Sequence, residues 1–150
     1  MKRGLTLSAI ALGLSACAPP HGAGGGQGSR LDNQIAQAIG DPTTCVLLAD
    51  RATGKVTYQY GESANCSRAL PACDAPGTLT AQTALKFAAQ GRLASCASSA
   101  DGSRHVGWAE GRVQSTKSDL VFSAVMEGER ALPGHEMNAR LYDAFAAAGL

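Results

Sequence analysis

Four cysteines in the body of the chain are the residues whose type and number most clearly suggest chemistry: Cys45, Cys66, Cys73 and Cys96. An even number of cysteines is typical of a disulfide framework in an exported protein. Four cysteines allow three pairings, and the closeness of Cys66 and Cys73 around Pro71 favours Cys66–Cys73 together with Cys45–Cys96. No Cys-x2-Cys or His-x3-His spacing occurs, so we expect neither a metal site nor a cofactor.

A catalytic thiol is the alternative role for Cys73. A cysteine nucleophile needs a neighbouring base or a lowered pKa, and the sequence places neither His105 nor His135 beside it. Acidic side chains that could be paired for acid–base work are Asp74, Glu62, Glu110 and Glu136. No spacing distinguishes these carboxylates from solvated surface charge. We therefore expect no catalytic residue in the chain and a disulfide at Cys73.

The N-terminal segment has the composition of an export signal. Lys2 and Arg3 are followed by an apolar run over residues 5–14, which is too short to span a bilayer as a mature helix. Small residues then precede Cys17 in Leu14-Ser15-Ala16-Cys17. This arrangement resembles the signal peptide of bacterial lipoproteins. The resemblance implies that residues 1–16 are removed and that Cys17 carries two or three acyl chains, enough for stable membrane anchoring.

The residue after this cysteine bears on the destination of the protein. Lipoproteins that stay in the inner membrane of many Gram-negative bacteria carry Asp at this position, whereas this chain has Ala18. The resemblance thus implies the periplasmic face of the outer membrane, with the outer face of the inner membrane as the alternative. An ordinary secretory signal with a chance cysteine is a second alternative.

Length, composition and charge limit the nature of the chain beyond the signal. Residues 17–29 would be the lipidated cysteine and a Gly- and Pro-rich tether, and residues 30–150 have the size of a single domain. The formal net charge of +1 would become −1 without Lys2 and Arg3, and acidic and basic residues are interspersed. Nothing in this balance favours a nucleic-acid partner.

Helical periodicity marks both ends of the expected domain. A helix should begin near Ser29, whose spacing to Asp32 resembles a capping box, and end at Gly40 and Pro42. Its apolar positions are Leu31, Ile35, Ala38 and Ile39. A terminal helix carries a second apolar stripe, formed by Met137, Leu141, Ala144, Phe145 and Ala148. Both helices need a partner, and a sheet is the available one.

Strand patterns fill the region between these helices. Residues 44–50 and 55–60 predict a hairpin around the Thr53-Gly54 turn, and residues 105–112 and 120–127 predict a second strand pair in which Trp108 is a core residue. Between the pairs, Thr78 or Thr80 can cap a helix that ends at Gly91 and is followed by a polar loop. Its shared apolar face consists of Ala81, Ala84, Leu85 and Ala88. The order predicts an α+β fold with a mainly antiparallel sheet of about four strands against N- and C-terminal helices.

Several stretches resemble class D β-lactamases and related penicillin-binding transpeptidases. They are the segment Cys45-Val-Leu-Leu-Ala-Asp-Arg-Ala-Thr-Gly-Lys55 with Tyr58 and Tyr60, then Ala64-Asn-Cys-Ser-Arg-Ala-Leu-Pro-Ala72, then Val106-Gly-Trp-Ala-Glu110, the strand at 120–126 and the terminal helix with Arg140, Leu141 and Leu150. The resemblance spans residues 44–150 and implies the opening hairpin, the last two strands and the final helix of that family.

The catalytic motifs of the family are missing from this chain. Its nucleophilic serine begins a Ser-x-x-Lys motif, whereas here Pro71-Ala72 is followed by Cys73-Asp74-Ala75-Pro76. There is no room for the all-α insertion that carries the second motif. The third, Lys-Thr-Gly, would fall near residues 98–102, where no lysine occurs.

These observations predict a lipid-anchored envelope protein with a reduced, non-catalytic domain that binds a partner or supports structure. Its partners would be the membrane, through the anchor, and an envelope protein or peptidoglycan. The first alternative is an enzyme, either of the β-lactamase superfamily or a Cys73-dependent acyl transferase or hydrolase. The second is a lineage-specific lipoprotein of unrelated fold. If the kinship holds, the final helix should pack across the sheet, between the first helix and the solvent.

Overall fold

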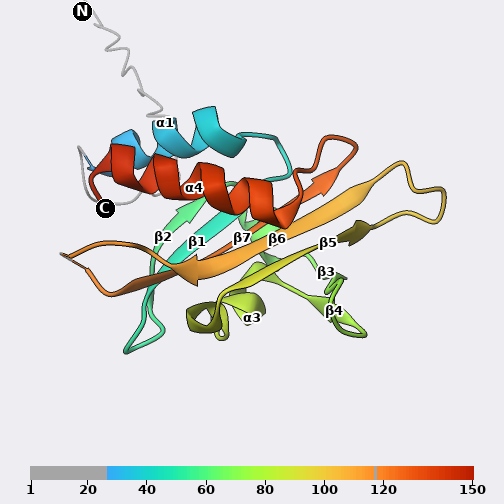
Figure 1. The fold of residues 1–150 in the computed structure, drawn as a ribbon, viewed down its shortest axis with the longest axis horizontal. Coiled ribbons are helices and arrows are strands. Elements are labelled where there is room, and N and C mark those ends of the chain that lie inside the picture. Colours follow the sequence, from blue (N-terminus) through green and yellow to red (C-terminus); the bar gives the residue numbers. More distant parts are fainter. Residues whose placement is uncertain (1–26, 117) are drawn as a thin grey trace, which may run out of the picture.

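A five-stranded antiparallel sheet forms the centre of the computed structural model, which describes residues 27–116 and 118–150 (Figure 1). The expected signal peptide, Cys17 and most of the tether lie outside these residues. The strand order is β2-β1-β7-β6-β5. The strands are β1 (Cys45–Asp50), β2 (Val56–Tyr60), β5 (Arg92–Ala97), β6 (His105–Arg112) and β7 (Leu120–Gly128). The predicted hairpin and second strand pair are thus present, with β6 at the expected bounds.

The central strands are buried on both faces. Alternate side chains of a strand point to opposite faces, so Val46 and Leu48 join one apolar cluster while Cys45, Leu47 and Ala49 join the other. The same alternation holds in β6, where Ala109 belongs to the first cluster and Trp108 to the second. Other elements therefore have to cover the sheet on both faces.

One face is covered by α1 (Gln27–Ile39) and α4 (Gly134–Ala148), which lie side by side (Figure 1). Their predicted apolar positions are buried against the sheet, with Ala38 partly exposed. Two expectations need correction. The first helix begins at Gln27, two residues before the expected start. Ser29 therefore lies in the first turn of the helix and not at its N-cap. The final helix also packs directly on β5 and β6 beside α1, since both helices carry apolar stripes that reach the sheet.

The other face is covered by short elements: α2 (Ser63–Ser67), the two-stranded sheet of β3 (Leu70–Pro71) and β4 (Thr78–Leu79), α3 (Ala81–Leu85) and the 3-10 helix η1 (Ala88–Gln90). Thr80 caps α3, because its side chain accepts a hydrogen bond from the Thr83 N–H. Gly91 ends η1 with a positive φ of 71°, but its ψ of 113° lies outside the left-handed helical region that was predicted for this stop. The single helix expected before Gly91 is divided into α3 and η1. The apolar face that the sequence predicts for this region is buried, and it consists of Ala81, Ala84, Leu85 and Ala88.

The α+β class is confirmed, but the main sheet has five strands where about four were expected. The additional strand, β5, comes from the segment that the sequence presents as a polar loop. Its residues are small or polar apart from Leu93, which is half exposed, so they give little apolar alternation. This is physically reasonable because β5 is an edge strand that pairs only with β6.

A close backbone contact fixes α4 on the sheet. A Cβ atom at Gly134 would overlap the carbonyl oxygen of Trp108 and the backbone of Ala94. The Gly134 N–H also donates to the Ser95 hydroxyl at 2.7 Å. The first turn of α4 therefore packs on β5 and β6 at a distance that only glycine permits.

Within the described part of the chain, no helix has the length and apolar character needed to cross a membrane.

Candidate functional site

Two disulfides connect the four body cysteines, with pairing Cys45–Cys66 and Cys73–Cys96. The favoured pairing was therefore wrong, although all four residues are bridged as predicted. The sheet order gives the reason. Cys45 on β1 and Cys96 on β5 are three strand positions apart, or roughly 14 Å at the usual strand spacing, which exceeds the span of a disulfide. Cys66 instead lies on α2 over β1.

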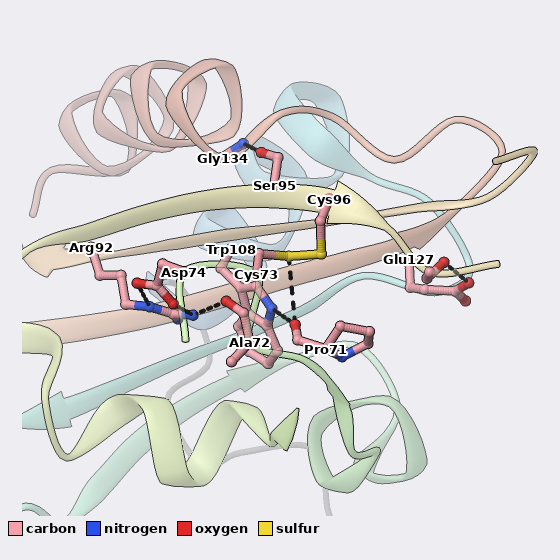
Figure 2. Close-up of a disulfide and its surroundings, with 11 residues drawn as sticks. Pro71, Ala72, Cys73, Asp74, Arg92, Ser95, Cys96, Trp108, Glu127 and Gly134 are labelled. Carbon is pink, nitrogen blue, oxygen red and sulfur yellow. Dashed lines mark hydrogen bonds and ion pairs between the residues drawn. A yellow bond between two sulfur atoms is a disulfide. The ribbon is translucent and has the colours of Figure 1, made fainter. Parts of the chain in front are cut away.

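The Cys73–Cys96 bridge fastens the turn between β3 and β4 to the edge strand β5 (Figure 2). The turn is closed by a hydrogen bond from the Ala72 N–H to the Gly77 carbonyl. Cys73 has a φ of 72°, a left-handed conformation that residues other than glycine rarely adopt. Cys73 thus lies at a turn whose backbone is held in an uncommon shape beside β5.

Arg92, the first residue of β5, ties the same turn to the sheet without covalent bonds. Its guanidinium makes a two-pronged pair with Asp74, with distances of 2.6 and 2.8 Å, and donates to the carbonyl of Ala72. Its third contact is to the Glu110 carboxylate of β6, at 2.6 Å. We call Arg92, Asp74, Glu110 and the Ala72 carbonyl the Arg92 cluster.

Trp108 completes the contact between the turn and the sheet. Its indole N–H donates to the Pro71 carbonyl at 2.7 Å, and its ring lies under the Arg92 guanidinium, 5.7 Å from the ring centroid (Figure 2). The side chain is fully buried, which agrees with the prediction of a core residue. A buried indole that finds a polar partner is the usual arrangement, and here that partner is the β3–β4 hairpin.

Glu110 is an unusual member of the cluster because it is buried in an apolar layer. Its second carboxylate oxygen, Oε2, has no hydrogen-bond partner among the described residues, and neither has the hydroxyl of Ser123, which lies opposite Glu110 on β7. Burial raises the pKa of Glu110, although Arg92 opposes this effect. The hydrogen bonds from Arg92 lower the pKa of Asp74. The single cation is therefore shared unequally between the two acids.

A second buried carboxylate, Glu127 at the end of β7, has the opposite environment. Arg104 donates to both of its oxygens at 2.9 and 2.7 Å, Ser98 donates at 2.8 Å, and Arg68 forms a second ion pair. The hydrogen bonds from Arg104, supported by Ser98 and Arg68, lower the pKa of Glu127 to about 2. This site holds a fully satisfied carboxylate.

The structure brings together some of the acids considered for catalysis and separates the others. Asp74 and Glu110 meet at Arg92, whereas Glu62 precedes α2 and Glu136 pairs with Arg140 on the surface of α4. The two histidines of the described chain, at positions 105 and 135, are exposed, and their imidazoles make no hydrogen bond or ion pair there. No group of three metal-ligating side chains is found in residues 27–116 and 118–150.

The arrangement around Cys73 is therefore a clamp that ties the β3–β4 turn to the sheet. The sulfur of Cys73 is bonded to Cys96, and no acid or imidazole is hydrogen-bonded to it within residues 27–116 and 118–150. Sequence reasoning missed Arg92 and the buried state of Glu110 and Glu127. A signal was present for the two glutamates, because each lies two residues after a buried apolar strand residue, Trp108 or Val125, and so shares its face.

Comparison of the chain with protein-family models, with curated proteins and with solved structures finds no match.

Proposed function

We propose that this chain is a lipid-anchored protein of the bacterial cell envelope whose folded domain has a non-catalytic, binding or structural role. The observation that carries the non-catalytic role is the Cys73–Cys96 disulfide, and the anchor rests on the resemblance of residues 1–17 to a lipoprotein signal peptide. The resemblance to penicillin-binding enzymes puts the nucleophilic serine at position 73. A residue whose sulfur is bonded to the edge strand, in a turn also held by Arg92 and Trp108, has no free nucleophile to offer.

Kinship with the β-lactamase and transpeptidase family is part of this proposal. It is supported by the opening hairpin beside α1 and by Gly107-Trp108 on β6. The final helix does not add support, because it lies beside α1 on the sheet and not between α1 and the solvent, as the kinship implied. The strand before Gly107-Trp108 is β5, where the Lys-Thr-Gly motif would lie, rather than residues 98–102, which form a loop. β5 contains no lysine. A reduced domain that kept the sheet and lost all three motifs fits these features.

Intact-mass analysis of the full chain, purified in detergent without reductant, tests the absence of catalysis. The protein is treated first with iodoacetamide and then with a fluorescent penicillin, with an active penicillin-binding protein as the positive control. We expect no alkylation of the four body cysteines and no penicillin adduct. A stable acyl adduct, or alkylation of Cys73 in the unreduced protein, would favour the enzyme alternative instead.

The anchor is tested separately by processing and fractionation. Wild-type protein should lose residues 1–16, gain the mass of the acyl chains at Cys17 and fractionate with the outer membrane. Cys17→Ala should give an unlipidated form that leaves this fraction. Identical behaviour of the two proteins would support an ordinary secretory signal, and wild-type protein in the inner-membrane fraction would favour the alternative location.

For the partner, we propose an envelope protein or peptidoglycan. Sedimentation of the detergent-purified protein with isolated peptidoglycan sacculi distinguishes the two classes. Binding that survives removal of sacculus-bound proteins supports the glycan, and its loss supports a protein partner.

A further inference from the structure

The two disulfides differ sharply in their surroundings. Cys45 and Cys66 are both 0% exposed and belong to the apolar cluster beneath β1. Cys73 and Cys96 are partly exposed and only border that cluster, at the edge of the sheet. Thiol–disulfide exchange requires an attacking thiolate to reach one sulfur along the S–S axis, so access controls its rate. The second bridge joins two residues that solvent reaches in the folded state, whereas the first joins two residues that solvent does not reach.

The backbone around Cys73 favours movement of the turn once the bridge is cut. The left-handed conformation at Cys73 is unfavourable for a residue with a side chain, and it persists only where its surroundings impose it. The turn at 72–77 lies outside regular structure, and the strands that flank it are only two residues each. Without the covalent bond, the turn is held by Arg92 and by the indole of Trp108.

We propose that Cys73–Cys96 is a redox-sensitive clamp, which a dithiol reductant opens in the folded protein while Cys45–Cys66 stays intact. Opening leaves only the hydrogen bonds of Arg92 and Trp108 to tie the 72–77 turn to the sheet, so the turn moves more freely and Trp108 becomes more accessible to water. The redox sensitivity of this bridge goes beyond the proposed function, because the bridge would open whether the domain binds a partner or supports structure.

The chemistry balances as a two-electron exchange. A thiolate of the reductant attacks one sulfur of the bridge, forms a mixed disulfide and expels the other cysteine as a thiolate, which takes a proton. The second thiol of the reductant then attacks the mixed disulfide and releases the remaining cysteine. The protein gains two thiols and the reductant becomes a disulfide. Reoxidation by a disulfide such as oxidised glutathione reverses the steps.

Trp108 provides a direct readout because it is the single tryptophan of the chain and is fully buried beneath the clamp. Oxidised full-length protein in detergent is incubated with dithiothreitol under native conditions, and samples are alkylated over time and digested for mass analysis. We expect Cys73 and Cys96 to be labelled at least tenfold faster than Cys45 and Cys66. Over the same time course, the emission of Trp108 should shift to longer wavelength, and oxidised glutathione should restore it.

A variant separates the clamp from general unfolding. Cys73→Ser/Cys96→Ser should show the shifted emission without reductant, retain the far-ultraviolet circular dichroism of the wild type and give no further shift with dithiothreitol. Should this variant fail to fold, the wild-type labelling rates still decide the question. Equal reduction rates for the two bridges, or selective reduction of Cys73–Cys96 that leaves the Trp108 emission unchanged, would overturn the proposal.

Discussion

Glu110 and Glu127 are buried carboxylates on neighbouring strands and on the same face of the sheet, yet they are held very differently. Glu110 has one arginine, which it shares with Asp74, and an oxygen without a partner in the described structure. Glu127 has two arginines and a serine. The pKa is raised for the first and lowered for the second. Burial alone therefore does not set the direction of the pKa shift, because the hydrogen-bond donors around Glu127 outweigh its desolvation and those around Glu110 do not.

The largest effect is expected when Glu110 loses its cation. Arg92→Leu leaves a buried carboxylate unpaired and removes the non-covalent tie to the 72–77 turn. The free energy of unfolding at pH 7 should fall by about 3–5 kcal/mol, the usual cost of breaking a buried pair. Urea denaturation measures this. A loss below about 1 kcal/mol would mean that Glu110 is already neutral at pH 7, and repeating the measurement at pH 5 should reduce the loss.

Glu127→Gln should have the next largest effect. It removes the charge that holds Arg68 and Arg104, but both arginines are more than 40% exposed and can regain water. We expect a loss of about 2–3 kcal/mol in unfolding free energy at pH 7. The matched control is Glu136→Gln, which breaks a surface pair with Arg140 and should cost less than about 0.5 kcal/mol. Equal losses in the two variants would refute the contrast between the sites.

The pH dependence of stability should have opposite signs at the two sites. The pKa of Glu127 is lowered from 4.5 to about 2, so its contribution of about 3 kcal/mol is complete above pH 4.5 and is lost as the pH falls toward 2. The pKa of Glu110 is raised from 4.5, so its contribution is present below pH 4.5 and is lost as the pH rises through the folded-state pKa.

Unfolding curves from pH 3 to pH 8 for the wild type, Glu110→Gln and Glu127→Gln separate these two contributions. Glu127→Gln should lose the stability gained between acid and neutral pH. Glu110→Gln should become progressively more favourable, relative to the wild type, as the pH increases. Parallel curves for all three proteins would show that neither carboxylate has a shifted pKa.

The smallest effect concerns Ser123, whose hydroxyl is buried opposite Glu110 without a partner in the described chain. Ser123→Ala removes a desolvated polar group and should change the unfolding free energy by less than about 1 kcal/mol, in the stabilising direction. Ser95→Ala is the control, because that hydroxyl accepts from the Gly134 N–H and its loss should cost about 1 kcal/mol. A clear loss for Ser123→Ala would point to a hydrogen bond with protonated Glu110.

The elements predicted from sequence are those in which apolar spacing is strong and local. The stripe of α4, the opening hairpin and the bounds of β6 follow from periods of 3.6 and 2 residues. β5 escaped prediction because its short side chains carry little periodic signal. The disulfide pairing was predicted wrongly for a different reason. Proximity in sequence suggested Cys66–Cys73, whereas the order of the strands in the sheet decides which cysteines meet. The Arg92 cluster depends on that same order, since it joins a turn to two strands.

The antiparallel packing of α1 and α4 has a consequence for the connectivity of the domain. Arg140 contacts the Ala38 carbonyl near the end of α1, and Leu31 near its start shares a cluster with Ala148. The start of α1 and the end of α4 therefore lie at the same end of the molecule (Figure 1). A short linker could join them and close the chain into a ring. Reopening that ring at the exposed turn around Asp101 and Gly102 would give a circular permutant that keeps both disulfides and every strand pairing.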